Sequence, residues 1–149
     1  MADYHGFTRT NYFRVTDEKK FREIIARCVA EDNVDIFKSD SGDGKFAFGC
    51  YANIQEDIAC GAHDSCWFCE KTDTDECKSY SFYEALQSLV ADDDAIIITE
   101  VGYEKLRYLV GVSIVITKND IRGVNLASAA LSVAKEMLAN PDYNTVMDY

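Results

Sequence analysis

Histidine, proline and tryptophan are scarce in this chain of 149 residues, which contains two histidines, one proline and one tryptophan. The histidines, His5 and His63, lie near the amino terminus and within a cysteine-rich segment. Few histidines are therefore available to act as the base in a Ser-His-Asp or Cys-His catalytic arrangement. Residues 41–44, SGDG, are too short for a phosphate-binding loop and read as a turn between two strands. The sequence thus lacks the residues and loops that are typical of hydrolases and group-transfer enzymes, and this favours a non-enzymatic role.

Long apolar runs are also lacking. No run approaches the length that spans a bilayer, and residues 1–10 have no apolar stretch of the kind found in signal peptides. We therefore expect no membrane association and a cytoplasmic location. The hydrophobic fraction of 48% indicates a globular chain, and the length suits one domain over residues 1–149.

Basic residues are nearly absent from the middle of the chain. The formal net charge is −11, and residues 53–94 contain eleven acidic residues against two lysines. The segments on either side each carry a balance of −1. Neutralising phosphates requires Lys and Arg, so we expect no direct nucleic-acid binding by the middle segment. Long-range attraction favours a basic protein surface as its partner, although a simple solubilising acidic face is an equally open interpretation.

The hydrophobic pattern predicts strands over residues 11–15, 34–38, 45–52, 95–101 and 107–117, after a frayed start at residues 1–10. It predicts helices that follow the capping residues Thr16, Ser81 and Asn125. The order β-α-β-β-α-β-β-α predicts an α+β fold, with a mostly antiparallel sheet of about five strands and helices on one face. The first six elements match a ferredoxin-like plait. Residues 53–80 would form an acidic, cysteine-rich insertion.

Cysteine is concentrated in that insertion. Its candidate metal ligands are Cys60, His63, Cys66, Cys69 and Cys77, and a tetrahedral zinc site needs four such donors. A closed set of four ligands predicts a structural zinc ion that orders an insertion with too few apolar residues for its own core. The spacing lacks the paired arms of a zinc ribbon, so free thiols and disulfides remain alternatives. The other two cysteines, at positions 28 and 50, are expected to be packing residues.

Two further interpretations concern the same insertion. A redox-active Cys66–Cys69 pair is disfavoured because Asp64 and Glu70 would raise the thiol pKa values. Side chains held by the metal could instead contact a partner, and the candidates are Trp67, Phe68, Asp73, Asp75 and Glu76. The two aromatic residues could equally well cover the insertion against the main sheet.

The turn between the last two predicted strands is an alternative ligand site. Glu100, Tyr103, Glu104 and Arg107 combine acids, a base and a phenol on a rigid sheet, where a small molecule or a substrate could bind. A salt-bridged hairpin is the simpler interpretation of the same residues.

The segments TRTNYFRVTDE and GYEKLRYLVGVSIVITKNDI resemble small acidic proteins of phages and conjugative elements in gut Firmicutes. The resemblance covers about half of the chain and consists of framework strands and turns. It implies an accessory or anti-defence factor that acts by binding, and it assigns no functional residues. In that family the region of the insertion is shorter and lacks clustered thiols.

These observations together predict a non-enzymatic protein-binding module. Its acidic surface, ordered by a structural zinc ion, would bind a basic partner. The competing hypothesis is a small-molecule-binding protein or enzyme that uses the sheet near Glu100 and Tyr103.

Overall fold

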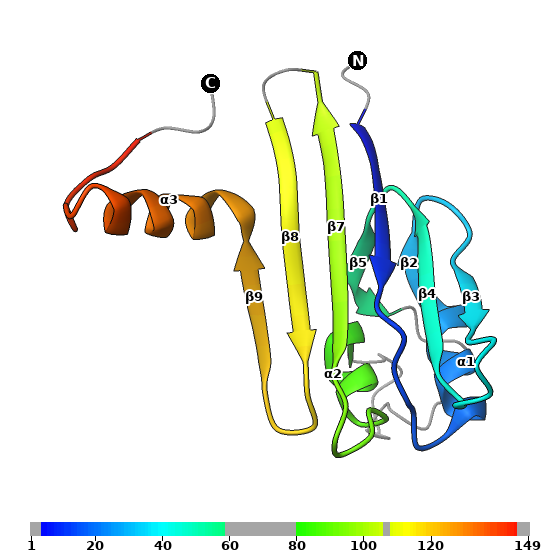
Figure 1. Cartoon of the computed structure of the whole chain (residues 1–149). Helices are drawn as coiled ribbons and strands as arrows, with labels where there is room; N and C mark the ends of the chain where they lie inside the picture. Colours follow the sequence, from blue (N-terminus) through cyan, green and yellow to red (C-terminus); the bar gives the residue numbers. More distant parts are fainter. Residues whose placement is uncertain (1–3, 59–79, 106–107, 146–149) are drawn as a thin grey trace, which may run out of the picture.

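Six antiparallel strands form the main sheet in the computed structural model, which describes residues 4–58, 80–105 and 108–145 (Figure 1). Their spatial order is β3 (Asp35–Lys38), β4 (Phe46–Tyr51), β1 (Tyr4–Thr10), β7 (Ile96–Glu104), β8 (Tyr108–Ile116) and β9 (Ile121–Asn125). In the same part of the chain, a smaller sheet contains β2 (Cys28–Ala30), β5 (Ile54–Ile58) and β6 (Tyr80–Ser81), and the helices are α1 (Glu18–Arg27), α2 (Phe82–Gln87) and α3 (Leu126–Met137). The α+β class and the mostly antiparallel sheet are confirmed.

The helices begin at side chains that satisfy free backbone N–H groups. Asp17 accepts a hydrogen bond from the backbone N–H of Lys20 at 3.0 Å, and Asn125 accepts one from Ser128 at 3.1 Å. Ser81 plays the same role at the start of α2. The caps at Ser81 and Asn125 are confirmed, whereas the first helix is capped one residue later than the expected Thr16.

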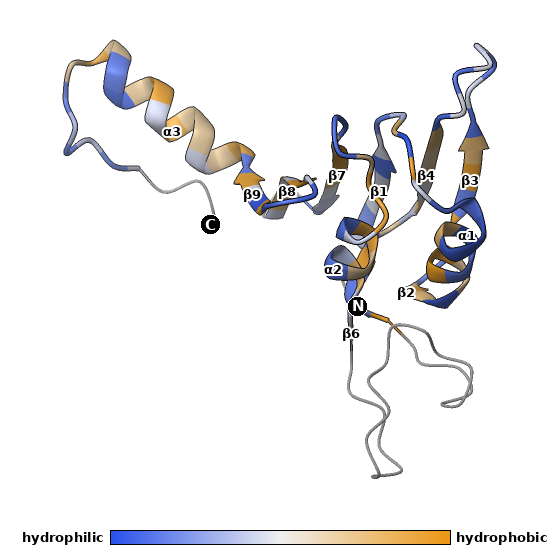
Figure 2. Ribbon diagram, turned by 90° about the horizontal axis from the view of Figure 1, so that it is seen from below, coloured by the Kyte–Doolittle hydropathy of each residue, from blue (hydrophilic) through white to orange (hydrophobic). Residues whose placement is uncertain are grey.

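Strand alternation gives the main sheet two different faces. We call the face beneath α1 and α2 the helix-side face and the opposite one the open face (Figure 2). On β7 and β8 the pairs Ile96–Ile116 and Ile98–Ile114 belong to the helix-side face. The neighbouring pairs Ile97–Val115, Val101–Gly111 and Tyr103–Leu109 belong to the open face.

The core lies between the helix-side face and the two helices. Four phenylalanines are its largest members, and each is fully buried: Phe13, Phe21, Phe48 and Phe82. Their rings meet at centroid distances of 5.6 to 6.3 Å, several of them edge to face. Such contacts add to the free energy gained from burying apolar area.

The predicted start of the chain was wrong. Residues 4–10, expected to be frayed, form the central strand β1, which pairs with β4 on one side and β7 on the other. Residues 11–15, expected to be the first strand, instead form a connection with isolated bridges at Phe13 and Val15. The inward positions of β1 are the buried Thr8 and Thr10, so the strand lacks the apolar alternation that identifies strands. The hydroxyl of Thr10 accepts a hydrogen bond from the backbone N–H of Phe48 at 3.0 Å, which makes a threonine suitable there.

Four short strands were not anticipated. They are β2, β5, β6 and β9, of which β9 extends the main sheet beyond the five expected strands. Strand β5 falls inside the expected insertion of residues 53–80, and its Ile54 and Ile58 are buried in the core. The start of that segment is therefore integral to the described fold.

The last helix departs from the expectation that the helices cover one face of the sheet. Helix α3 follows β9 without a loop and extends past the edge of the sheet (Figures 1 and 2). None of its residues is buried. Its first residue, Leu126, lies over Gly111 of β8, where a Cβ atom would come within 3.0 Å of the leucine side chain. Gly111 thus lets the helix start at the open face.

Candidate binding surfaces

The open face exposes large apolar side chains across several strands. Phe7, Tyr51, Tyr103 and Leu109 are 53%, 75%, 51% and 76% exposed. The imidazole of His5 lies against Tyr103 at a ring distance of 5.5 Å. Isolated apolar residues are common on protein surfaces, whereas contiguous apolar patches are typical of surfaces that bind proteins, membranes or ligands.

Besides a hollow of about 620 Å³ that Leu109, Gly111 and Leu126 line at the start of α3, two shallow hollows lie within the open face. One, of about 490 Å³, is lined by Phe7, Val101, Tyr103, Leu109 and Leu126 together with the backbone around them. The other, of about 360 Å³, lies nearer the β3 edge, where the guanidinium of Arg9 stacks over Phe37 at 4.7 Å. Both hollows are open to solvent and mainly apolar.

Carboxylates gather on the opposite side of the main sheet, around Glu100. The Tyr4 hydroxyl donates a hydrogen bond to Glu100 at 2.6 Å. Burial, this bond and the charges of Glu100 and Glu31 raise the pKa of Tyr4 far above its usual value. The pKa of Tyr83 is also raised, by burial first and then by Glu56 and Glu100. Glu100 thus raises the pKa values of two phenols from different elements, Tyr4 of β1 and Tyr83 of α2.

A larger hollow, of about 700 Å³, lies beside this acidic region, between α1, β2 and β3. Ile25, Ala26 and Val34 contribute apolar parts of its wall, and Glu31 and Asp32 contribute carboxylates. Arg22, which pairs with Glu18 at 2.9 Å, also lines the hollow. Both carboxylate residues are exposed. The combination of an apolar wall and an acidic rim suits the long stem and charged head of a lysine or arginine side chain.

The alternation of β7 separates the residues of the alternative ligand site. Glu100 and Glu104 lie on the helix-side face, whereas Tyr103 lies on the open face, and Arg107 falls outside the described residues. The void beside Glu100 has a volume of only about 20 Å³, which is room for one water molecule. The sheet therefore brings Glu100 together with Tyr4 and not with Tyr103.

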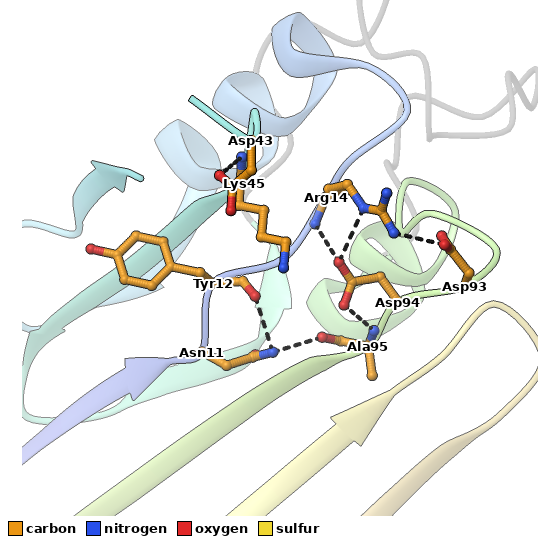
Figure 3. Close-up of polar contacts among 8 residues, drawn as sticks. All are labelled: Asn11, Tyr12, Arg14, Asp43, Lys45, Asp93, Asp94 and Ala95. Carbon is orange, nitrogen blue, oxygen red and sulfur yellow. Dashed lines mark hydrogen bonds and ion pairs between the residues drawn. The ribbon is translucent and has the colours of Figure 1, made fainter. Parts of the chain in front are cut away.

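Three aspartates follow α2, and the structure gives them a structural role. Arg14 forms an ion pair with Asp93 at 2.7 Å, and its backbone N–H donates to Asp94 at 3.0 Å (Figure 3). Asp92 pairs with Lys118. The hydrogen bond and charge of Arg14 lower the pKa of Asp93. The contacts of Arg14 fix the connection between β1 and α1 against the turn that precedes β7, and the pair with Lys118 joins that turn to the one between β8 and β9.

The two described cysteines are packing residues, as expected. Cys28 and Cys50 are partly buried free thiols beside the core. Burial raises the pKa of Cys28 to about 11, and burial and neighbouring carboxylates raise that of Cys50. A raised pKa keeps a thiol protonated and unreactive at neutral pH.

The cysteine-rich segment lies outside the described residues. This applies to the candidate ligands Cys60, His63, Cys66, Cys69 and Cys77 and to the candidate contact residues Trp67, Phe68, Asp73, Asp75 and Glu76. Strands β5 and β6 pair at Ile58 and Tyr80, the residues that flank the segment. Within the described ranges, no group of three His, Cys, Asp or Glu side chains is placed to hold a metal ion.

Sequence reasoning did not identify the open face as a surface. The sequence did contain an indication of this surface, because β7 and β8 carry apolar residues on both faces and do not alternate strictly between apolar and polar residues. None of the helices in the described part of the chain is long and apolar enough to cross a membrane. Comparisons of the chain with protein-family models, curated proteins and solved structures find no match.

Proposed function

We propose that this protein is a non-enzymatic protein-binding module whose acidic side engages a basic protein surface. The observation that carries the proposal is a group of carboxylates on the helix side of the main sheet: Glu100 accepts a hydrogen bond from Tyr4, and Glu31 and Asp32 border the hollow between α1, β2 and β3. Glu31 also acts on Tyr4, and Glu56 acts on Tyr83. Residues 53–94, whose formal net charge is −9, include strand β5 and helix α2 on this side of the sheet. Electrostatic attraction of a basic partner speeds its encounter and orients its approach.

The chemistry of the described residues supports binding over catalysis. Cys28 and Cys50 have raised pKa values, which oppose nucleophilic attack. The hydroxyls of the buried Thr8 and Thr10 donate hydrogen bonds to the backbone carbonyls of Ala52 and Phe48. The void beside Glu100 is too small for a substrate.

We further propose that the cysteine-rich segment extends this acidic side. In this proposal Cys60, Cys66, Cys69 and Cys77, with His63 able to replace one of them, bind a structural zinc ion. The pairing of β5 with β6 supports the idea, because it holds the two ends of the segment together and reduces the entropy lost when a metal orders it. The candidate contacts with the partner are then Trp67, Phe68, Asp73, Asp75 and Glu76.

The proposal includes two finer assignments. The order β3-β4-β1-β7, with α1 and α2 on one face, supports a ferredoxin-like plait as the central unit, extended by β8, β9 and α3. The resemblance to mobile-element proteins supports a role as a cytoplasmic accessory or anti-defence factor.

A synthetic lysine- and arginine-rich peptide is a suitable probe for the acidic side. Binding measured by calorimetry should weaken as the salt concentration rises from about 50 to about 300 mM. The triple variant Glu31→Gln, Asp32→Asn, Glu56→Gln should lose most of the affinity. A matched variant with the same change of charge elsewhere, Asp40→Asn, Glu136→Gln, Asp142→Asn, should retain it.

The cysteine-rich segment is tested by the same titration with Asp73→Asn, Asp75→Asn and Glu76→Gln combined. Equal affinity for the peptide in all variants, or equal binding of a glutamate-substituted control peptide, would refute the proposal. Loss of affinity only in the variant of the cysteine-rich segment would locate the site there and remove the described carboxylates from it.

A further inference from the structure

Strands β7 and β8 have the composition of strands that are covered on both faces. In β7, Ile97, Val101 and Tyr103 point to the open face while Ile96 and Ile98 point to the core. Continuous apolar strands are typical of sheets buried on both sides, because a strand with one wet face normally alternates. In the described part of the chain only the helix-side face is covered. The sequence is therefore suited to a second layer.

In the described part of the chain, helix α3 is an amphipathic element of which only the first turn, at Leu126, lies against the sheet, and none of its residues is buried. Leu126, Val133 and Met137 lie on one side of the helix by their spacing and are 67%, 53% and 82% exposed. An isolated helix of 12 residues is marginal in water and normally depends on tertiary packing. The helix therefore also requires a partner surface.

The connection to β9 directs α3 away from the described part of its own chain. Asn125 is both the last residue of β9 and the cap of α3, so no loop exists to turn the helix back. Beyond Leu126, the helix extends away from the sheet edge on the side opposite α1 and α2 (Figure 2). A second chain placed beside it would present an open face to the helix.

The charges permit two copies of this acidic chain to meet at this face. The strand positions that point to the open face carry Arg9, Arg122 and one acid, Asp35. Arg122 also pairs with Asp120 at 2.6 Å. Helix α3 contributes one base and one acid, Lys135 and Glu136. Almost none of the net charge of −11 thus lies on these two surfaces.

The area is sufficient for a stable dimer. A large apolar side chain has an accessible surface of about 200 Å². The four open-face residues Phe7, Tyr51, Tyr103 and Leu109, the three α3 residues Leu126, Val133 and Met137 and the residue that ends α3, Leu138, then expose about 1,000 Å² per chain at their observed exposures. Two chains would bury about 2,000 Å², at the upper end of the standard range for specific interfaces.

We propose that two copies of the chain form a symmetric dimer in which α3 of each copy lies across the open face of the other. In a dimer with two-fold symmetry, each open face is covered by the helix of the other copy, and each helix packs against the open face of the other copy. The acidic sides remain on the outside of this dimer. The dimer does not depend on the basic partner, so each proposal can fail without the other.

Sedimentation equilibrium of the full chain from about 1 to about 100 μM, a range that brackets micromolar affinity, tests the dimer. We expect twice the mass of the chain at the upper end. Leu109→Lys on the open face and Met137→Lys on α3 should each weaken the dimer at least about tenfold, since each places a charge in an apolar contact. Both positions are exposed in the single chain, so the variants should remain folded by circular dichroism.

Two control variants distinguish this interface from general effects of charge. Tyr108→Lys changes the neighbouring position on the other face of β8, and Ser132→Lys changes the polar side of α3. Both should remain dimeric. Mixing Leu109→Lys with Met137→Lys should restore a dimer, because one of the two contacts then joins an unaltered helix to an unaltered face.

Three outcomes would overturn the proposal. The first is a monomer at every concentration, which would mean that α3 folds onto its own chain or awaits a different protein. The second is a dimer that survives both test variants. The third is a dimer that is sensitive to Leu109→Lys alone, which would indicate sheet-to-sheet contact without the helix.

Discussion

Replacing Phe48 with alanine should distinguish the two faces of strand β4 by their contribution to stability. The Phe48 ring is fully buried and lies 5.9 to 6.3 Å from three other phenylalanine rings. Phe→Ala substitutions in a packed core cost about 3–5 kcal/mol, from lost burial and from the cavity that remains. With a urea dependence of about 2 kcal/mol per molar, a loss of about 4 kcal/mol lowers the unfolding midpoint by about 2 M.

The matched control is Tyr51→Ala, three residues along the same strand on the open face. Tyr51 is 75% exposed, so its removal should change the unfolding free energy by less than about 1 kcal/mol. Both variants are compared with the original chain by urea unfolding at about 1 μM, where association contributes least. Equal losses for Phe48→Ala and Tyr51→Ala would refute the assignment of core and open face.

Three further predictions concern chemistry at single groups. Cys28 should react with iodoacetamide much more slowly at pH 8 in the folded chain than in urea, because its pKa is raised to about 11; peptide mass mapping measures the difference. The contribution of this raised pKa to the free energy of unfolding should be fully present below about pH 9 and should be lost as the pH rises through about 11. Arg14→Gln should lower the unfolding free energy at pH 7, and the difference should shrink in acid as Asp93, whose folded pKa is depressed, becomes protonated; a constant difference from pH 7 to pH 2 would contradict the ion pair. Purified protein should contain about one zinc ion per chain by elemental analysis, and Cys66→Ser combined with Cys69→Ser should abolish it; zinc content that is absent, or unchanged in the variant, would rule out the proposed site.

The parts of the fold that sequence predicts well are those where local signals agree. Strands β7 and β8 are long and apolar, and Ser81 and Asn125 carry the capping chemistry of their helices. Strand β1 could not be found in this way, because its inward residues Thr8 and Thr10 are satisfied by hydrogen bonds that only the folded sheet creates. Tertiary context here outweighs local pattern.

The candidate sites likewise include features that the local sequence predicts and features that only the folded chain creates. Period-2 alternation alone places Glu100 and Tyr103 on opposite faces, so their separation was predictable once β7 was recognised as a strand. The exposure of α3 was not predictable, because an apolar stripe is the same whether the surface that covers it lies in its own chain or in another. The positions of Glu31 and Glu56 on the helix side of the sheet depend on the pairing of β2 with β5, two short strands that carry little sequence signal.

Hydrogen exchange measured along the chain by mass spectrometry tests most directly the claim that the two sides of this protein serve different partners. Raising the protein concentration should protect the amides of α3 and β8, and adding the basic peptide should protect residues 28–35 and 54–58. Protection of the same segments by both changes would contradict the account, as would an α3 whose exchange is independent of concentration.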